Sequence, residues 1–150
     1  MTRVVRQSLV KSVLIIDDEF LIANALAHML RAAGYDADLA RDGKEALGMV
    51  SSVPYDLVIC DVRMPVMDGI EFYAHLKRLR PDLAKRVAFC TGDLDNPRTR
   101  DFLQNCGVPF LQKPFRLRGL LDIVDGMLSV GSWQMPHASD LQSMGQPALT

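Results

Sequence analysis

The chain alternates short apolar runs with longer segments in which apolar residues recur every three or four positions. The short runs are rich in Val, Ile and Leu, as is typical of strands that are buried on both faces of a sheet. They predict strands at residues 12–16, 37–40, 57–60, 87–90 and 108–111. The helical spacing predicts helices at residues 20–33, 43–52, 69–79, 96–105 and 117–128.

Five strands that alternate with five helices predict an α/β fold, a doubly wound, open, five-stranded parallel sheet with helices on both faces. A closed eight-fold barrel needs about 250 residues, so a chain of 150 residues excludes it. We expect residues 1–11 to form an N-terminal lead and residues 12–130 to form the domain. Residues 131–150 are rich in Gly, Ser, Gln, Met and Pro, and predict a flexible C-terminal tail.

Composition narrows the classes of protein to which the chain can belong. Hydrophobic residues make up 49% and charged residues 23%, which is enough to form a core. No apolar stretch approaches the roughly 18 residues of a membrane span, and the basic N-terminus lacks the apolar block of a signal peptide. The net charge of −1 and the lack of a basic patch argue against direct binding of nucleic acid. We therefore expect a cytoplasmic protein without membrane contact.

The three cysteines do not have the spacing of a metal finger. Cys60 and Cys90 lie within apolar runs. Together with Cys106 they make three cysteines, an odd number that leaves no complete disulfide framework. We interpret them as buried thiols in a reducing compartment.

Polar residues follow four of the predicted strands directly. Asp17 and Asp18 follow the first strand, Asp61 the third, Thr91 the fourth and Lys113 the fifth. Taken singly, each has an ordinary explanation as a helix cap, a turn residue or a solvated charge. In an open parallel sheet, however, the carboxyl ends of the strands meet at one edge, where ligands bind. We therefore expect these five side chains to form one site.

The residue types indicate phosphoryl chemistry with a metal ion. Three converging carboxylates repel one another unless a cation is present, and oxygen ligands suit Mg²⁺ or Mn²⁺. A cation held by Asp18 and Asp61, with Asp17 behind them, prepares a place for phosphate oxygens. Lys113 and Thr91 can then contact the remaining oxygens. A carboxylate nucleophile beside a metal ion is the chemistry of an aspartyl phosphate.

Four sequence runs resemble the receiver domain of two-component response regulators, the CheY-like family. The resemblance covers residues 12–128 and rests on the runs LIIDDE, ICDVRMPVMDGIEF, AFCTGD and FLQKPF. It implies a flavodoxin-like sheet with the strand order 2-1-3-4-5. It also implies a switch in phosphorelay signal transduction, with self-catalysed phosphotransfer and slow autodephosphorylation, in place of an enzyme with a separate substrate.

The resemblance assigns roles to the metal-binding and phosphate-accepting residues. Asp61 matches the residue that accepts a phosphoryl group from a histidine kinase or a histidine phosphotransfer protein. Asp17 and Asp18 match the acidic pair, in which Asp18 is the direct metal ligand. The backbone carbonyl of Arg63 matches a further ligand.

The resemblance also assigns a switch. Thr91 matches the switch hydroxyl, Lys113 the phosphate-binding lysine and Phe110 the switch aromatic residue, here without a hydroxyl group. The Lys113–Pro114 bond matches one that is commonly cis. The switch is expected to move the face made by the fourth helix, the fifth strand and the fifth helix, through which a homodimer can form.

Two further charges lie close to the predicted site in sequence. Arg63 follows Asp61 by two residues, and Asp93 follows Thr91 by two. If the third and fourth strands are neighbours, the two side chains face each other across the mouth of the site. We predict that they tune the lifetime of the phosphoryl group; the alternative is a pair of solvated charges without a role.

Other classes of protein fit the sequence less well. Phosphatases of the haloacid-dehalogenase type place a second Asp two residues after the nucleophile on the first strand, whereas Arg63 stands there and Asp61 follows the third strand. A flavodoxin-like nucleotide binder needs a phosphate-binding loop where this chain has acids, and a pure interaction module does not need the five site residues. The chain is expected to be either a single-domain response regulator or the receiver part of a hybrid histidine kinase or longer regulator.

Overall fold

Five parallel strands form the sheet that the sequence predicts. In a computed structural model, which describes residues 10–129, the strands are β1 (Ser12–Ile16), β2 (Asp36–Ala40), β3 (Leu57–Asp61), β4 (Val87–Thr91) and β5 (Phe110–Gln112). Their order is β2-β1-β3-β4-β5, which confirms the predicted fold class and strand order. Most of the predicted N-terminal lead and the whole predicted tail lie outside the described residues.

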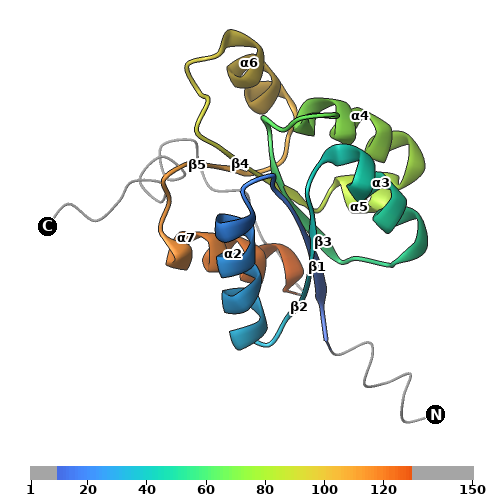
Figure 1. Ribbon diagram of the computed structural model, residues 1–150, viewed down its shortest axis with the longest axis vertical. Helices are drawn as coiled ribbons and strands as arrows, with labels where there is room; N and C mark the ends of the chain where they lie inside the picture. The colour runs from blue at the N-terminus through green and yellow to red at the C-terminus, as the bar shows by residue number, and fades with distance from the viewer. Residues whose placement is uncertain (1–9, 130–150) are drawn as a thin grey trace, which may run out of the picture.

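Helices cover both faces of the sheet (Figure 1). They are α2 (Phe20–Ala32), α3 (Gly43–Ser52), α4 (Gly69–Leu79), α5 (Pro81–Ala84), α6 (Pro97–Asn105) and α7 (Leu117–Leu128). Helices α2 and α7 pack on one face, and α3 to α6 lie on the other. None of the helices in residues 10–129 is long and apolar enough to cross a membrane.

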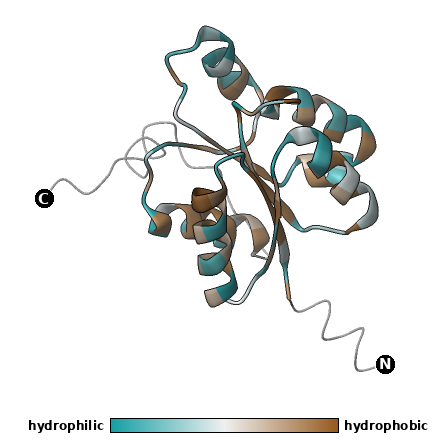
Figure 2. Cartoon of the chain, viewed as in Figure 1, coloured by the Kyte–Doolittle hydropathy of each residue, from teal (hydrophilic) through white to brown (hydrophobic). Residues whose placement is uncertain are grey.

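The alternation of side chains along each strand gives the domain two hydrophobic layers. In β1, Val13 and Ile15 face α2 and α7, whereas Leu14 and Ile16 face the opposite helices. Figure 2 shows the apolar residues gathered on the strands and on the sides of the helices that face them. Because helices cover both faces of the sheet, the central strands β1, β3 and β4 are almost completely buried.

Side-chain caps begin three of the helices. The Asp42 carboxylate accepts a hydrogen bond from the Glu45 N–H at the start of α3, and Asp68 does the same for Glu71 at the start of α4. The Asn96 side chain accepts hydrogen bonds from two backbone N–H groups of α6. These caps satisfy donors that the first turn of a helix leaves without intrahelical partners.

Apart from shifts of one residue at the ends of other elements, the observed elements differ from the predicted ones at the fifth strand and at α5. The fifth strand begins at Phe110 instead of residue 108, where Pro109 has no N–H to donate to the sheet. The short helix α5 is not among the predicted helices, and it begins at Pro81, a position that proline favours.

Burial protects two of the three thiols. Cys60 and Cys90 are buried, as predicted, whereas Cys106 is half-buried, and all three are free. Burial raises the pKa of each thiol, to about 12 for Cys90. Cys60 and Cys90 therefore belong to the core and lack the accessible setting of a reactive cysteine.

Gly69 allows the start of α4 to approach the end of β3. A Cβ atom at this position would lie 2.3 Å from the Asp61 carbonyl oxygen and 3.0 Å from the Val62 Cα. The Gly69 N–H donates to the Val62 carbonyl at 2.8 Å, so the two segments are also hydrogen-bonded. Because Gly69 has no side chain, α4 can pack directly against the backbone of Asp61 and hold it in position.

We predict that Gly69→Ala lowers the free energy of unfolding by about 1–3 kcal/mol, because backbone must move to admit the methyl group. Gly48→Ala is the matched control. A Cβ atom there meets nothing within 4 Å, so this change within α3 should raise stability by about 0.5–1 kcal/mol. Urea unfolding of both variants measures the difference, and a Gly69→Ala variant as stable as the wild type would contradict the packing described here.

Candidate functional site

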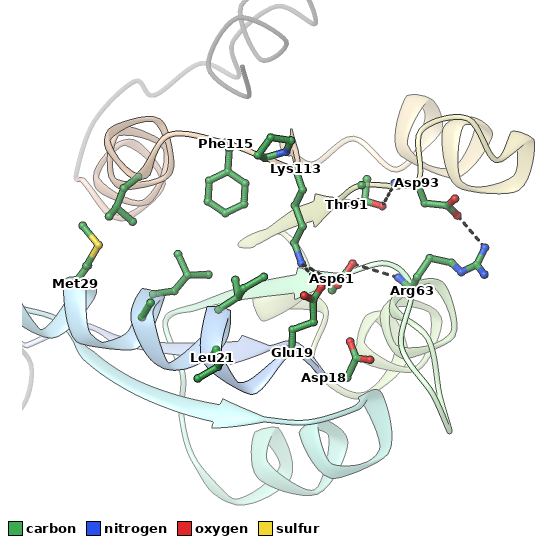
Figure 3. A pocket seen from close by; sticks show the side chains of 16 residues that line it. Asp18, Glu19, Leu21, Met29, Asp61, Arg63, Thr91, Asp93, Lys113 and Phe115 are labelled. Carbon is green, nitrogen blue, oxygen red and sulfur yellow. Dashed lines mark hydrogen bonds and ion pairs between the residues drawn. The ribbon is translucent and has the colours of Figure 1, made fainter. Parts of the chain in front are cut away.

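The carboxyl ends of the strands open into a pocket of about 1060 Å³. Asp17 follows β1, Asp61 ends β3, Thr91 ends β4, and Lys113 follows β5. All four residues lie at this edge of the sheet because the strands are parallel and their carboxyl ends lie close to one another in register. Figure 3 shows Asp61, Thr91 and Lys113 at this edge.

Lys113 joins the buried carboxylates of this edge. Its Nζ lies 2.9 Å from Asp17 Oδ2 and 3.0 Å from Asp61 Oδ2, and Glu19 Oε1 lies at 3.7 Å. The side chains of Lys113, Asp17 and Asp61 are 15%, 5% and 8% exposed. The peptide bond between Lys113 and Pro114 is cis, as the resemblance implied.

Burial and charge act against each other on this cluster. Burial raises the pKa of Asp61 and the neighbouring Asp17 adds to this, so the pKa stays above its ordinary value of 3.8 although Lys113 opposes the shift. Burial lowers the pKa of Lys113, but its bonds to Asp17 and Asp61 outweigh that effect and raise the pKa. Lys113 is therefore protonated, whereas the ionisation of Asp61 lowers the stability of the fold.

The carboxylate cluster has the composition of a site for a hard cation. Oxygen atoms of Asp17, Glu19 and Asp61 lie within 4.8 Å of one another. Three carboxylates beside one ammonium group leave an excess of negative charge, which a divalent cation with oxygen ligands can neutralise. The residues present thus fit Mg²⁺ or Mn²⁺.

The structure places Asp18 differently from the sequence prediction. Asp18 lines the pocket but is exposed, and its side chain lies apart from those of Glu19 and Asp61 (Figure 3). Glu19, which sequence analysis did not select, approaches Lys113 and the two buried acids instead. Its position in the run of three acids after β1 was the available signal, but the sequence alone does not say which acids of that run approach Lys113.

Thr91 and Asp93 are connected beside the carboxylates. The Thr91 hydroxyl oxygen accepts a hydrogen bond from the Asp93 N–H at 3.0 Å. The Asp93 carboxylate pairs with the Arg63 guanidinium at 2.9 Å, so the predicted encounter of these two charges is confirmed. Arg63 also donates its backbone N–H to Asp61 Oδ1 at 3.3 Å, which joins the loop to the acidic cluster.

Phe110 lies between the two hydrophobic layers. The residue is half-buried and packs against both, at the start of β5 and opposite Phe89 of β4. Its ring is therefore close to the strand that carries Thr91. The side of the pocket towards α2 and α7 is apolar, with side chains such as Leu21, Met29 and Phe115 (Figure 3).

A family model decides the classification of this chain. Residues 13–125 match the model of the response regulator receiver domain. The chain belongs to this family. It is therefore a domain of the signalling-switch class in two-component systems.

Relatives of this receiver domain include short and long proteins. The tetrathionate response regulatory protein TtrR of Salmonella typhimurium is 33% identical over 118 residues, which are 79% of this chain and 56% of that protein. The chemotaxis protein CheY of Halobacterium salinarum is 29% identical over 119 residues, which are 98% of its length. The chain thus spans about half of TtrR, about a sixth of the ZraR regulator of Escherichia coli, and nearly all of CheY.

Solved structures show the same fold. The chemotaxis response regulator CheY4 of Vibrio cholerae is 30% identical with a TM-score of 0.69, and the match covers 79% of this chain and 99% of that one. The response regulator TrrA of Thermotoga maritima matches with the same identity, coverage and TM-score, in a structure of its complex with Mg²⁺ and BeF.

We predict that Asp61→Asn stabilises the receiver domain at neutral pH when divalent cations are removed by a chelator. The folded pKa of Asp61 is raised, so its ionisation costs stability above that pKa, and the cost disappears as the pH falls through it. The advantage of Asn should therefore be full at neutral pH and absent below the ordinary pKa of 3.8.

Urea unfolding at several pH values tests this expectation. Asp18→Asn makes the same change at an exposed acid and should have little effect without a cation. An Asp61→Asn variant less stable than the wild type at neutral pH would show that the charge of Asp61 supports the fold.

Proposed function

We propose that this receiver domain accepts a phosphoryl group on Asp61 and changes conformation in response. The observation that carries the proposal is the buried Asp61 carboxylate at the pocket, 3.0 Å from the Lys113 ammonium group. The donor is the phosphohistidine of a histidine kinase or a histidine phosphotransfer protein, and the site of action is the cytoplasm. The domain serves either as a single-domain response regulator or within a hybrid histidine kinase or longer regulator.

The transfer requires little acid–base chemistry from the protein. A carboxylate oxygen of Asp61 attacks the phosphorus atom as the bond between phosphorus and the histidine nitrogen breaks. The electron pair of that bond stays on the nitrogen, which is then protonated. Lys113 holds Asp61 in place before the transfer and afterwards neutralises a phosphoryl oxygen, while the Thr91 hydroxyl donates to another.

Mg²⁺ or Mn²⁺ would be held by Asp17, Asp18, Asp61 and the backbone carbonyl of Arg63. When bound, the cation supplies positive charge for the phosphoryl oxygens. Asp18 lies at the edge of the pocket and would turn inward to join the buried acids. Glu19 already lies near them and can contribute to the charge that attracts the cation.

The response would travel from Thr91 to Phe110. When the Thr91 hydroxyl turns to the phosphoryl group, it leaves the Asp93 N–H and vacates space beside β4. The half-buried Phe110 ring can then turn inward, and burial of an aromatic ring contributes about 1–2 kcal/mol, enough to shift a two-state balance. The surface formed by α6, β5 and α7 would change with it and present a new face to a partner or to a second copy.

Incubation with acetyl phosphate and Mg²⁺ should add the mass of one phosphoryl group to the wild type. Asp61→Asn should remain unmodified, because the nucleophile is absent. Lys113→Ala should still bind the metal ion but lose the conformational response. Intact-protein mass spectrometry measures the first two, and labelling that persists in Asp61→Asn would place the acceptor elsewhere.

Beryllofluoride, which stands in for the phosphoryl group on Asp61, tests the switch on the same proteins. In the wild type with Mg²⁺, amide resonances should shift near Asp61 and also near Phe110. Shifts confined to the loop of Asp17 and Asp18 would contradict a path to Phe110.

Arg63 and Asp93 are suited to control how long the phosphoryl group persists. Their ion pair crosses the mouth of the pocket at 2.9 Å and is largely exposed. An exposed pair contributes only about 0–1 kcal/mol to stability. Its position matters more, because hydrolysis needs a water molecule in line with the bond between phosphorus and the Asp61 oxygen.

We predict that Arg63→Ala shortens the phosphorylated lifetime several-fold, because water then reaches the phosphorus atom more easily. The melting temperature should change little. Asp93→Ala releases the same guanidinium group and should act in the same direction. The test is to follow the loss of the acyl phosphate with time in the wild type, Arg63→Ala and Asp93→Ala. Equal rates in all three would mean that the ion pair has no role in the lifetime.

A further inference from the structure

Helix α6 has a smaller apolar attachment to the domain than the other long helices. Only Thr99 and Leu103 of its nine residues are buried. The half-buried Phe102 adds edge-to-face contacts with Phe89 of β4 and Tyr73 of α4, at ring-centroid distances of 5.1 and 5.7 Å. In Figure 1, α6 lies at the margin of the domain, beyond the ends of the strands. A helix with so small an apolar contact can be repositioned at little cost.

Polar contacts at the N-terminus of α6 fix its resting position. Arg98 Nη1 lies 2.9 Å from Asp68 Oδ2, which connects α6 to the start of α4. One residue later, the Thr99 hydroxyl donates to Asp93 Oδ2 at 3.3 Å. Within the described residues, the carboxylates of Asp68 and Asp93 thus hold the N-terminus of α6 from outside the helix.

The Asp68 carboxylate connects Arg98 with the phosphoacceptor. Its second oxygen, Oδ1, caps α4 by accepting the Glu71 N–H at 2.9 Å. The next residue, Gly69, packs directly against the Asp61 backbone. Burial acts to raise the pKa of Asp68, but the Glu71 N–H and Arg98 outweigh it and lower the pKa, as expected for a carboxylate that stays ionised beside the guanidinium group.

The other polar contact reaches the switch hydroxyl. Asp93 accepts from Thr99 through its carboxylate and donates its N–H to the Thr91 hydroxyl oxygen. When Thr91 turns towards Asp61, the segment between β4 and α6 must change, and α6 is attached to it. Contacts that keep the N-terminus of α6 against α4 therefore oppose that change.

We propose that Arg98 is a positioning residue for the switch: its ion pair with Asp68 holds α6 in the unphosphorylated arrangement. The proposal rests on the function assigned to Asp61 and adds a residue that contacts neither the metal ion nor the phosphoryl group. Breaking the pair removes a contact of the resting state, so activation becomes easier.

The test is the affinity for beryllofluoride with Mg²⁺, measured by titration of full-length variants. Arg98→Gln and Asp68→Asn each remove the ion pair, and Asn retains the oxygen that caps α4. Each should lower the apparent Kd two- to five-fold, the range of an exposed ion pair worth up to about 1 kcal/mol. Arg98→Lys keeps the positive charge, so its apparent Kd should stay close to that of the wild type.

Two controls separate positioning from a general effect of charge or stability. Arg100→Gln makes the same charge change on the same helix, where the side chain is exposed and forms no ion pair within residues 10–129, and should leave the Kd unchanged. The double variant Arg98→Gln with Asp68→Asn should match either single variant, because one change already breaks the pair. The melting temperature of each of these variants should differ little from that of the wild type.

The outcomes distinguish this inference from the proposed function. A wild type that fails to bind beryllofluoride would refute the function itself. If the wild type binds, an unchanged or weaker affinity in Arg98→Gln overturns the role of Arg98. An effect of Arg98→Gln that persists in full in the Asp68→Asn background also overturns it, because Arg98 would then act without Asp68.

Discussion

The site depends on the Lys113 ammonium group, which stands between two buried carboxylates. Asp17 and Asp61 come from neighbouring strands, and both carboxylates lie within 3.0 Å of the Lys113 Nζ. Burial raises the pKa of Asp61, and the Lys113 ammonium group opposes that shift. Because one ammonium group serves both acids, with Glu19 near it as well, the charges of the cluster do not balance. The excess of negative charge favours a divalent cation with oxygen ligands, and in the function proposed above that cation would lie beside the nucleophile Asp61.

The parallel sheet explains why sequence alone located most of this site. A residue that directly follows a parallel strand must lie at one edge of the sheet, so Asp17, Asp61, Thr91 and Lys113 could be placed together from their spacing to the apolar runs. Within a loop this argument fails, because the backbone after the strand sets the direction of each side chain. For that reason the sequence did not show that Glu19, and not Asp18, approaches the buried acids in the resting structure.

The ion pair between Arg98 and Asp68 was not predicted from the sequence pattern. Arg98 and Asp68 are 30 residues apart, and both are polar, so the apolar pattern does not indicate that they meet. The pair between Arg63 and Asp93 was predicted because both residues have a fixed distance from the end of a neighbouring strand. The short helix α5 was missed because its four residues, Pro81–Ala84, are too few to show a helical period in the sequence.

The small apolar attachment of α6 separates the residues that stabilise the domain from those that govern its response. The folded state depends mainly on the two hydrophobic layers against the sheet, to which α6 contributes little. Local opening of this helix should therefore require much less free energy than global unfolding, and its amide hydrogens should exchange with solvent ahead of those in β1 and β3. In evolutionary terms, the polar residues of α6 can vary under selection for a particular signalling partner with little penalty in folding.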